Sequence, residues 1–391
     1  MLEICDFVCK LRLANCKFFH GILFLMKTRV DTTLVVLLLT LIVGGALVFS
    51  SAALGLLARG ATHISGVVFN HFVLGIGGGL SLMLIAFAVD YKKWRPLAPY
   101  IFGAALVATA LVFIPGLGFE HGGGRRWIDL GFATLQPSEF LKIGAIIMAA
   151  TYFSFLREGA ATWRGPVAFA GILGIPGILL LLQPDLGTLG IVSISVFAIF
   201  LASGARVRDI ALIIVTAVAV LALLVLTPQY RYVYERIDTF FNPEKQSALV
   251  EGYQIRQSLI AIGSGGLTGR GFGQGVQKFT YLPEPMGDSI YAVLAEEMGF
   301  LGGVALIGAF LALGLRGYSI AARAPDLFGG LLAVGISTYL VGEAFINIAA
   351  MLGLAPLTGI PLTFISQGGS AMLVSLASAG ILLNISRRRS K

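Results

Sequence analysis

Apolar runs long enough to cross a bilayer recur along this chain, and short polar segments separate most of them. A helix rises about 1.5 Å per residue, so about 20 apolar residues are needed to cross roughly 30 Å of hydrocarbon. We count about ten such runs and predict an all-α, polytopic integral membrane protein. The predicted spans are 34–56, 67–89, 97–115, 137–156, 167–184, 186–204, 210–227, 289–315, 327–352 and 369–386.

The composition agrees with this pattern, because 57% of the residues are hydrophobic, only 12% are charged and the mean hydropathy is +0.89. An ordinary soluble domain has about 25% charged residues. The fifth and sixth runs are separated only by QPDLG at 183–187. Proline and glycine there predict a tight helical hairpin instead of one overlong helix.

A longer polar loop, 228–288, follows the seventh span and is too short and too polar to form an independent domain. Within it, 230–241 and 251–262 have helical spacing with apolar faces, which is typical of helices lying on a membrane surface. The predicted organisation is a cytoplasmic segment 1–33, a ten-helix membrane domain 34–386 that includes this loop, and a basic tail 387–391.

The first 25 residues are too charged for a span and have no small-residue cleavage site. They form either an amphipathic helix on the cytoplasmic membrane surface or an extension before the true initiator, Met26. The more ordinary start sequence at 26–31 favours the second interpretation. Cys5, Cys9 and Cys16 all lie here, on the reducing side, so we expect no disulfide framework and no cysteine metal site.

The distribution of lysine and arginine predicts the orientation. With the N-terminus inside, 18 of the 28 Lys and Arg residues fall in cytoplasmic segments, in agreement with the positive-inside rule. Both termini are therefore predicted to be cytoplasmic, and loop 228–288 extracytoplasmic. The net charge of +8 reflects this topology and the anionic inner leaflet. No nucleic-acid partner is expected, because no basic soluble region could bind one.

The stretch 281–297, YLPEPMGDSIYAVLAEE, places Asp288 where the long loop re-enters an apolar span. An acid at this position is costly unless it is paired or functional. The preceding segment 269–278, GRGFGQGVQK, is flexible and basic, but it has neither a Walker nor a clean dinucleotide-binding pattern. These features predict an outer-face site for a lipid-linked, negatively charged substrate.

A second polar cluster on the same face contains GGGRRWIDLG at 122–131 and QPSEFLK at 136–142. Arg125, Arg126 and Lys142 have side chains that bind phosphate oxygens well. Anchoring at the membrane interface is the competing interpretation of Arg126 and Trp127. Glu139 and Lys142, at i,i+3, can also pair with each other. A cation inside a span needs a reason, which favours a phosphate contact for Lys142.

Two further polar segments fall on the predicted outer side. Asp185, in the 183–188 hairpin, either caps the sixth span or contacts substrate. In GIPLTFISQGGS at 359–370, small residues open the last span. Free N–H groups there would form an anion site, and Ser366, Gly368, Gly369 and Ser370 are the candidates. Close helix packing through the two glycines is the other interpretation.

Glu343 lies within the ninth run, far from any loop. An intramembrane carboxylate is a functional candidate by default. The alternative is a protonated acid hydrogen-bonded to Asn347, one turn along the helix. The four histidines are too scattered to predict a metal site, and no Ser/His/Asp or Cys/His arrangement is expected.

Together these segments resemble the SEDS family of shape, elongation, division and sporulation proteins, which includes FtsW, RodA and SpoVE. The resemblance covers nearly everything after Met26 and departs from the family pattern at Gly275 and Gln367. Its LPEPMGDSI segment is more similar to the FtsW, or division, branch than to the RodA branch. The matching segments are RRWI at 125–128, QPSEFLK at 136–142, QPDLGT at 183–188, GVQK at 275–278, LPEPMGDSI at 282–290, AEEMGF at 295–300 and GGS at 368–370.

The resemblance implies a SEDS-type fold and a peptidoglycan glycosyltransferase of the bacterial cytoplasmic membrane, which polymerises the precursor lipid II on the extracytoplasmic side. It implies a class B penicillin-binding protein as crosslinking partner, together with other divisome or elongasome membrane proteins. It assigns the catalytic role to Asp288. Gln277, Lys278 and Glu284 join the outer-face residues above as substrate-binding candidates.

A carboxylate suits this reaction because the acceptor hydroxyl must lose a proton as it attacks. The pyrophosphate leaving group is already a weak base, so it needs charge neutralisation instead of the second carboxyl of a glycosidase. Arg125, Arg126, Lys142 and Lys278 are the predicted cations. A divalent cation, Mg²⁺ or Mn²⁺, is a further candidate, and no organic cofactor is expected.

Three alternatives stay open. A lipid II flippase would explain the many spans and the intramembrane Glu343, although charge gathered around Asp288 on the outer face favours catalysis. A scaffold with an inactive site would not require Asp288. The same polymerase could also serve cell elongation, as in RodA, instead of division.

Overall fold

The computed structural model of this chain describes residues 30–58, 64–121, 124–129, 131, 134–156, 163–242 and 250–388. The prediction that Met26 is the initiator, with nearly all of the segment 1–33, lies outside the described residues. The end of the basic tail, 389–391, lies outside them as well.

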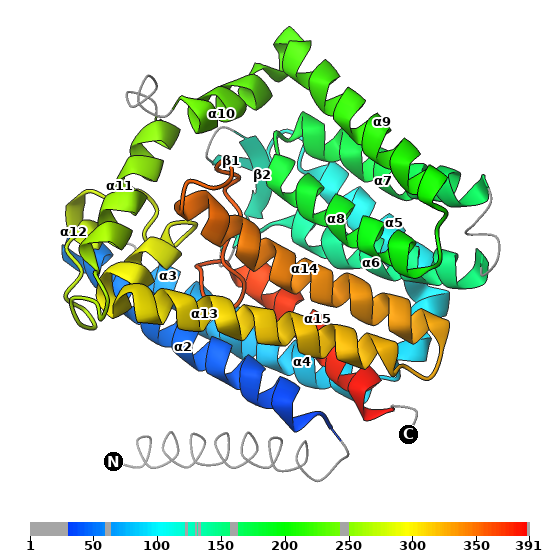
Figure 1. The fold of residues 1–391 in the computed structure, drawn as a ribbon, viewed down its shortest axis with the longest axis horizontal. Coiled ribbons are helices and arrows are strands. Elements are labelled where there is room, and N and C mark those ends of the chain that lie inside the picture. The colour runs from blue at the N-terminus through cyan, green and yellow to red at the C-terminus, as the bar shows by residue number, and fades with distance from the viewer. Residues whose placement is uncertain are drawn as a thin grey trace.

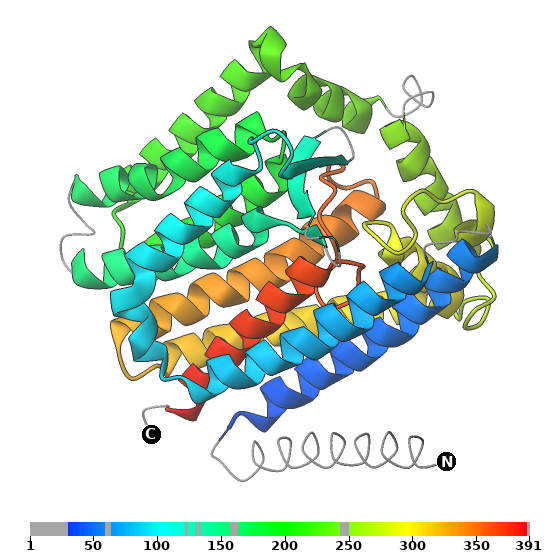
Figure 2. The ribbon, with the colours of Figure 1, turned by 180° about the vertical axis from the view of Figure 1, so that it is seen from behind.

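The described residues form a bundle of long helices with a small sheet at one end (Figures 1 and 2). The helices are α2 (Thr32–Ala58), α3 (Ile64–Phe69), the π-helix η1 (Asn70–Gly78), α4 (Gly79–Ala88), the 3-10 helix η2 (Tyr91–Lys93), α5 (Trp94–Leu111), α6 (Pro137–Leu156), α7 (Arg164–Leu182), α8 (Leu186–Ala202), α9 (Val207–Leu226), the 3-10 helix η4 (Pro228–Tyr230), α10 (Arg231–Phe241), α11 (Val250–Ser264), α12 (Gln277–Thr280), α13 (Ile290–Ala322), α14 (Leu327–Met351) and α15 (Gly369–Arg387).

The polytopic helical fold is confirmed, because eight helices in the described part are long and apolar enough to cross a membrane. The helices α5 and α8 occur at the other two predicted spans, although α8 is a shorter apolar helix of 17 residues. The tight hairpin is also confirmed, since α7 ends at Leu182 and α8 begins at Leu186. The count of ten spans stays a prediction.

Helix α13 continues to Ala322, beyond the predicted end at 315, and it bends at Gly299, where φ is +68°. A Cβ at Gly299 would lie 2.3 Å from the backbone nitrogen of Gly269. Glycine is therefore required both for this backbone conformation and for the close approach of the 265–276 loop. The bend lets this loop pack directly onto the first turns of the helix.

The segment between α5 and α6 contains a three-stranded antiparallel sheet of β1 (Gly118–His121), β2 (Gly124–Asp129) and β3 (Thr134–Leu135). Phe119 pairs with Trp127 across β1 and β2. The expectation of an all-α chain missed this sheet, because strands this short give no sustained alternation of apolar and polar residues. The sheet positions the arginines of β2 at one end of the bundle.

The long loop contains helices at the two stretches with helical spacing, because α10 and α11 occupy them. Helix α9, which leads into the loop, stands at the edge of the bundle in Figure 1, and only 6% of its span is buried. The loop therefore connects a peripheral helix to α13, which packs extensively against α14 and α2.

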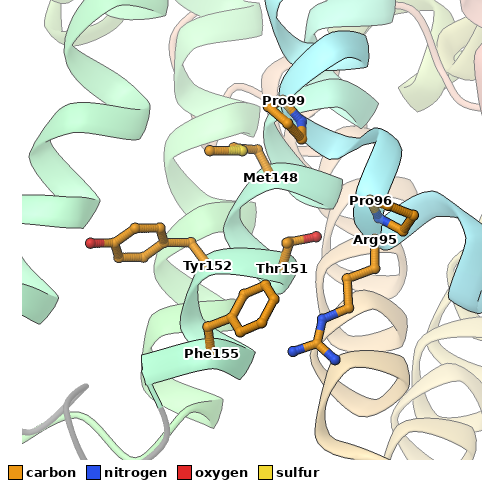
Figure 3. A pocket seen from close by; sticks show the side chains of 7 residues that line it. All are labelled: Arg95, Pro96, Pro99, Met148, Thr151, Tyr152 and Phe155. Carbon is orange, nitrogen blue, oxygen red and sulfur yellow. The ribbon is translucent and has the colours of Figure 1, made fainter.

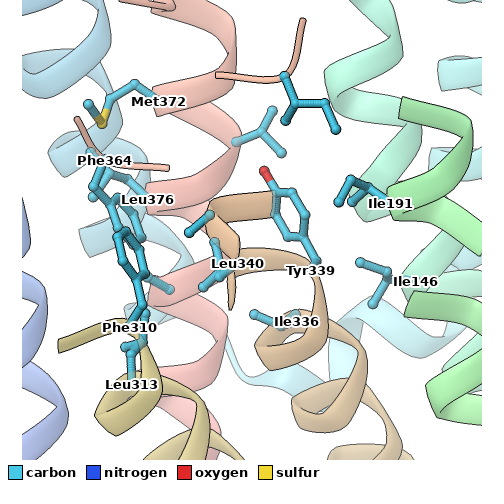
Figure 4. Packing of buried hydrophobic residues seen from close by; sticks show 14 of the residues in the cluster. Ile146, Ile191, Phe310, Leu313, Ile336, Tyr339, Leu340, Phe364, Met372 and Leu376 are labelled. Atoms are coloured by element: carbon cyan, nitrogen blue, oxygen red, sulfur yellow. The ribbon is translucent and has the colours of Figure 1, made fainter. Parts of the chain in front are cut away.

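Helix α14 lies at the centre of the core. In Figure 4 the ring of its Tyr339 lies between Leu340 and Ile191, with Ile146 below Ile191, while Phe310 and Leu376 lie on the other side of Leu340. The Tyr339 hydroxyl shares a 2.9 Å hydrogen bond with Ser375 Oγ of α15. Because α14 contacts α6, α8, α13 and α15, it can fix the relative positions of groups supplied by all four.

Charged contacts join the loops at the end of the bundle that was predicted to be cytoplasmic. Arg316 Nη2 lies 2.7 Å from Asp31 Oδ2, and Arg388 Nη1 lies 2.8 Å from Asp90 Oδ2. Segments predicted to share one side of the membrane therefore meet in space. The sheet and Asp288 lie at the opposite end.

Candidate active site

Asp288 lies in the turn immediately before α13, and neighbouring segments hold the main chain of this turn. Asn347 Nδ2 donates to the Asp288 carbonyl (2.8 Å) and Ser366 Oγ donates to the Gly287 carbonyl (2.6 Å). The backbone N–H of Gln367 donates to the Met286 carbonyl at 2.7 Å. The position of Asp288 is thus fixed by α14 and by the segment before α15, both remote in sequence.

The Asp288 carboxyl group is partly buried. Burial raises its pKa to about 6, and the negative charge of Glu284 acts in the same direction, while its own backbone N–H, the Gln254 amide and the positive charge of Arg236 oppose the shift. Oδ2 lies 3.8 Å from where a Cβ would stand on Gly359, whose φ is +65°. A carboxylate with a pKa near 6 is mostly ionised at neutral pH but remains a usable proton acceptor.

Helix α11 supports this turn from the loop side, because Gln254 is buried and its Nε2 donates to Ser289 Oγ at 2.9 Å. Glu284, a predicted substrate contact, is exposed at the start of the turn with a φ of +44°. Non-glycine residues with positive φ are uncommon. The turn therefore presents two carboxylates, one exposed and one partly buried.

Asp185 caps α8, as one of its two interpretations predicted, because its Oδ1 accepts from the Thr188 backbone N–H at 3.1 Å. Its other oxygen accepts from Ser138 Oγ (3.3 Å) and Gln136 Nε2 (3.4 Å), which belong to the start of α6. Asp185 is itself buried. It therefore joins two predicted outer-face segments.

Arg126 of β2 contacts the same hairpin. Its Nε donates to the Gln183 carbonyl (3.0 Å) and its Nη2 to the Pro184 carbonyl (2.5 Å). These bonds, made by Nε and Nη2, orient the guanidinium group. Arg125 is exposed and Trp127 is half-buried on the same strand. The strand thus places Arg126 beside the α8 N-terminus.

The segment 358–370 connects these parts. A Cβ on Gly187 would lie 2.9 Å from the Thr358 carbonyl, so the start of α8 packs on this segment. Ser370 Oγ accepts from the Gln136 backbone N–H at 3.3 Å. Gly368 and Gly369, at the start of α15, are half-buried. The structure therefore brings Asp185, Ser366, Gly368, Gly369, Ser370 and Asp288 to one end of the bundle.

Lys142 lies deeper, in a buried ion-paired cluster. Its Nζ is 2.8 Å from Glu139 Oε2 and 2.7 Å from Glu343 Oε1. Thr363 Oγ1 contacts the other oxygen of Glu343 at 3.2 Å. All three charged side chains are at most 2% exposed. This arrangement favours the ion-pair interpretation of Lys142 over a direct phosphate contact.

The hydrogen bond between Glu343 and Asn347, which was one of the two interpretations of Glu343, does not occur among the described residues. Asn347 Nδ2 donates to the Asp288 and Ile360 carbonyls instead, and its Oδ1 has no hydrogen-bond partner among the described residues. The sequence could not indicate this, because the partners of Glu343 come from α6 and from the segment before α15.

Lys278 is also buried, in an ion pair away from the surface. Its Nζ is 2.5 Å from Glu297 Oε1 and 2.7 Å from Ser51 Oγ. The neighbouring Glu296 accepts from the backbone N–H of Gln277, at 3.3 Å. The GVQK and AEE segments therefore bind each other and fix the loop before α13. Direct substrate contact by Lys278 and Gln277 has no support in this arrangement.

Sequence patterns did not indicate two residues that act on Asp288, Arg236 of α10 and Gln254 of α11, nor Tyr232 of α10, which contacts the hairpin side of the site. Arg236 is close enough for its charge to act on the carboxyl of Asp288, and Tyr232 OH lies 3.4 Å from the Leu181 carbonyl. The only sequence signal was an aromatic and basic helix in the long loop. It could not indicate which of its cations faces the acid.

The described residues contain no group of three or more His, Cys, Asp and Glu side chains that could hold a metal ion. Among the described residues, Glu284 is the acid whose charge acts on Asp288, so these two carboxylates are the candidate ligands for a cation there. Mg²⁺ commonly binds through one or two carboxylates and takes its remaining ligands from water and substrate phosphates. The residues present therefore fit a cation that arrives with a phosphorylated substrate.

Residues 31–391 match the family of cell cycle proteins FtsW, RodA and SpoVE. The chain is 38% identical over 363 residues to stage V sporulation protein E of Bacillus subtilis, covering 92% of this chain and 98% of that protein. It is 39% identical over 314 residues to a probable peptidoglycan glycosyltransferase FtsW of Geobacter sulfurreducens, covering 79% and 83%.

Two solved structures have the same fold. One is a chain of a peptidoglycan synthase complex, solved to show the structural coordination of polymerization and crosslinking. It has a TM-score of 0.72 and 27% identity, over 92% of this chain and 98% of that one. The rod shape determining protein RodA of Thermus thermophilus has a TM-score of 0.62 and 26% identity, over 93% and 98%. The chain therefore belongs to the FtsW/RodA/SpoVE family of cell cycle proteins.

Proposed function

We propose that this chain is a peptidoglycan glycosyltransferase that polymerises lipid II into glycan strands, with Asp288 as the general base. Relatives named as probable peptidoglycan glycosyltransferases support the reaction class. The observation that carries the proposal is Asp288 itself, a partly buried carboxyl with a pKa near 6, held by main-chain hydrogen bonds from two other segments.

In the proposed step, the hydroxyl oxygen of the acceptor sugar attacks the anomeric carbon of the donor sugar. A carbon–oxygen bond forms, Asp288 takes the hydroxyl proton, and the bond to the leaving oxygen breaks with its electron pair going to undecaprenyl pyrophosphate. The Asp288 carboxylate and the pyrophosphate are both negatively charged, so the leaving pyrophosphate needs cations that neutralise its charge. A base with a pKa near the working pH transfers the proton with little free-energy cost.

Among the described residues, we assign the leaving pyrophosphate to Arg125, Arg126 and Arg236. Arginine forks bind phosphate oxygens in pairs, and Arg236 already acts electrostatically on Asp288. Lys142 and Lys278 are less suited, because both contact buried carboxylates. A divalent cation held by Glu284 would add positive charge at the same place and leave Asp288 available as the base.

We place the Asp288 end on the extracytoplasmic side of the bacterial cytoplasmic membrane, with both termini in the cytoplasm. The support is the positive-inside distribution together with the joining of the basic loops at the other end. The relative described as a peptidoglycan synthase complex couples polymerisation to crosslinking. A class B penicillin-binding protein is therefore the proposed partner, with other division or elongation proteins around it.

The similarity to FtsW and to stage V sporulation protein E favours a role in division or sporulation over elongation. A flippase is the second candidate, because its main support was Glu343 inside a span. That carboxylate is held by Lys142 and Thr363, so it is not poised to move a charged headgroup through the bilayer. The geometry around Asp288 favours catalysis.

Purified protein with its transpeptidase partner, supplied with labelled lipid II in detergent or liposomes, tests the proposal. Long glycan strands resolved on a gel are the expected product. Transfer of labelled lipid II across liposomes without any polymer would reject the proposal and support the flippase.

A further inference from the structure

A groove opens between the first turns of α5 and the last turns of α6, at the end of the bundle opposite Asp288 (Figure 3). Its volume is about 430 Å³. Two prolines of α5, Pro96 and Pro99, form one wall. Met148, Thr151, Tyr152 and Phe155 of α6 form the other. Because 68% of Phe155 and 39% of Tyr152 are exposed, the groove faces the surroundings of the bundle, which in a membrane are lipid.

Arg95 stands at the mouth of this apolar groove. Its Cζ lies 3.9 Å from the centre of the Phe155 ring, so a cation–π contact holds the guanidinium group across the opening. Its Nε is buried and has no hydrogen-bond partner among the described residues. A guanidinium N–H buried without an acceptor is costly, which indicates a missing acceptor.

Thr151 supplies a second unpaired group. It is only 7% exposed and lines the groove, yet its Oγ1 has no partner in the described part of the chain. Hydroxyls in helices usually bond the carbonyl four residues earlier. Thr109, Ser195 and Thr338 do so here, at 2.7, 2.7 and 2.8 Å. The hydrogen-bonding capacity of the Thr151 hydroxyl is therefore unfilled in the described part of the chain.

We propose that this groove is a binding site for an anionic phospholipid of the leaflet at this end of the protein. The lipid phosphate accepts hydrogen bonds from Arg95 Nε and Thr151 Oγ1, and one acyl chain lies along Pro99, Met148 and Tyr152. Charge favours an anionic headgroup over a zwitterionic one, because Lys92 and Lys93, both exposed, lie three and two positions before Arg95. Basic pockets between helices at this membrane level suit such lipids.

Native mass spectrometry of the full-length detergent-solubilised protein tests the site, with phosphatidylglycerol or phosphatidylethanolamine added in equal amounts. We expect phosphatidylglycerol adducts on the wild type, and an at least fivefold lower adduct fraction for Arg95→Gln. The matched control is Arg208→Gln, which removes a cation whose side chain is 82% exposed at the same end. Equal adduct fractions in the two variants would overturn the proposal, as would equal binding of the two lipids.

Two further arms separate a specific site from weaker explanations. Thr151→Val removes only the hydroxyl and should lower the adduct fraction at least twofold, so it tests the site even if Arg95→Gln does not fold. Inorganic phosphate, tested as a competitor at millimolar concentration, should displace none of the lipid. Displacement of the lipid by inorganic phosphate would show an anion site without lipid selectivity and would overturn the proposal. An adduct fraction for Thr151→Val equal to that of the wild type would show that Thr151 does not contact the lipid phosphate.

Discussion

The side chain of Asn347 holds the main chain of Asp288: its Nδ2 donates to the Asp288 carbonyl at 2.8 Å and to the Ile360 carbonyl at 2.7 Å. One turn earlier on the same face of α14, Glu343 contacts Lys142 at 2.7 Å. A single buried helix therefore connects the proposed catalytic turn, the segment beside it and an ion-paired cluster below.

Replacing Asn347 should lower the rate of polymerisation by displacing Asp288, because Asn347 holds the Asp288 main chain. Asn347→Leu keeps the number and branching of the side-chain heavy atoms but leaves two carbonyls unpaired, at a cost of about 1–3 kcal/mol each. We expect the unfolding temperature to fall and polymerisation per folded molecule to drop at least about tenfold, since small misplacements of reacting groups are costly. Thermal unfolding and lipid II polymerisation measure the two effects.

Asn384 offers a matched control at the other end of the bundle, because it also bonds two main-chain groups, the Phe87 carbonyl and the Tyr91 N–H. Asn384→Leu should lower stability to a similar degree and leave the activity of the folded fraction nearly unchanged. An equal loss of activity in both variants would show that Asn347 acts only through stability.

The buried cluster of Glu139, Lys142 and Glu343 should behave as a structural unit. Removing one member of a buried ion pair costs about 3–5 kcal/mol, because an uncompensated charge remains. Lys142→Met alone should therefore accumulate poorly in the membrane. Combining it with Glu139→Gln and Glu343→Gln should restore accumulation and polymerisation. A triple variant that is folded, inserted and inactive would instead support the phosphate contact predicted for Lys142.

Local sequence rules predicted the parts of the site that are local in space. The cap formed by Asp185 and the pairing of Glu139 with Lys142 each involve residues within one helical turn, so spacing alone indicates them. Glu343 also pairs with Lys142, from a helix 201 positions later in the chain. No periodicity encodes that contact.

The same limit explains why Lys278 was predicted to bind phosphate. Its flexible, glycine-rich context indicated an open loop, but Glu297 and Ser51 bury its ammonium group. Only the tertiary packing of α2 and α13 reveals this. Asp288 was identified because a carboxylate at the edge of an apolar span is costly wherever it packs, whereas Arg236 had no comparable signal.

The topology can be tested without any assay of activity. Reporter tags at the N-terminus and after Arg388 should give cytoplasmic signals, and a tag between α10 and α11 should give an extracytoplasmic one, in accordance with the positive-inside distribution. Alkaline phosphatase and fluorescent protein fusions report the two sides. A cytoplasmic signal from the loop would place Asp288 on the wrong side for an extracytoplasmic polymerase.

The rate of polymerisation should depend on the ionisation of Asp288. Since burial raises its pKa to about 6, the base is present above that pH and lost below it. We expect a plateau above about pH 7 and roughly a tenfold loss per pH unit well below 6, for a single base. Initial rates between pH 4.5 and 8, with lipid II binding measured in parallel, check this. A flat profile would contradict the assignment.

Stability should show the opposite dependence on pH. The folded pKa of Asp288 lies above the unfolded value of 3.8, so the folded state binds more protons between these values, and stability falls as the pH rises through this window. Asp288→Asn removes this effect. The variant should therefore be more stable than the wild type at pH 7.5, with a smaller difference at pH 4, as thermal unfolding at both values would show.

The same substitution gives the decisive test of function. Asp288→Asn preserves size and most hydrogen bonding but cannot accept a proton, and general-base catalysis typically contributes about 10²–10⁴ in rate. We expect normal membrane insertion, normal association with the transpeptidase partner and normal lipid II binding, with no detectable glycan strands.

Asp326→Asn is the matched control and should retain polymerisation. It lies at the opposite end of the bundle, where Asp326 accepts a hydrogen bond from Tyr91 OH. Thermal unfolding of the variant at neutral pH, measured beside its activity, separates a loss of the base from a loss of the fold. Polymerisation by Asp288→Asn within a fewfold of the wild type, with partner and Mg²⁺ or Mn²⁺ present, would make the acid structural and favour the flippase or scaffold alternatives.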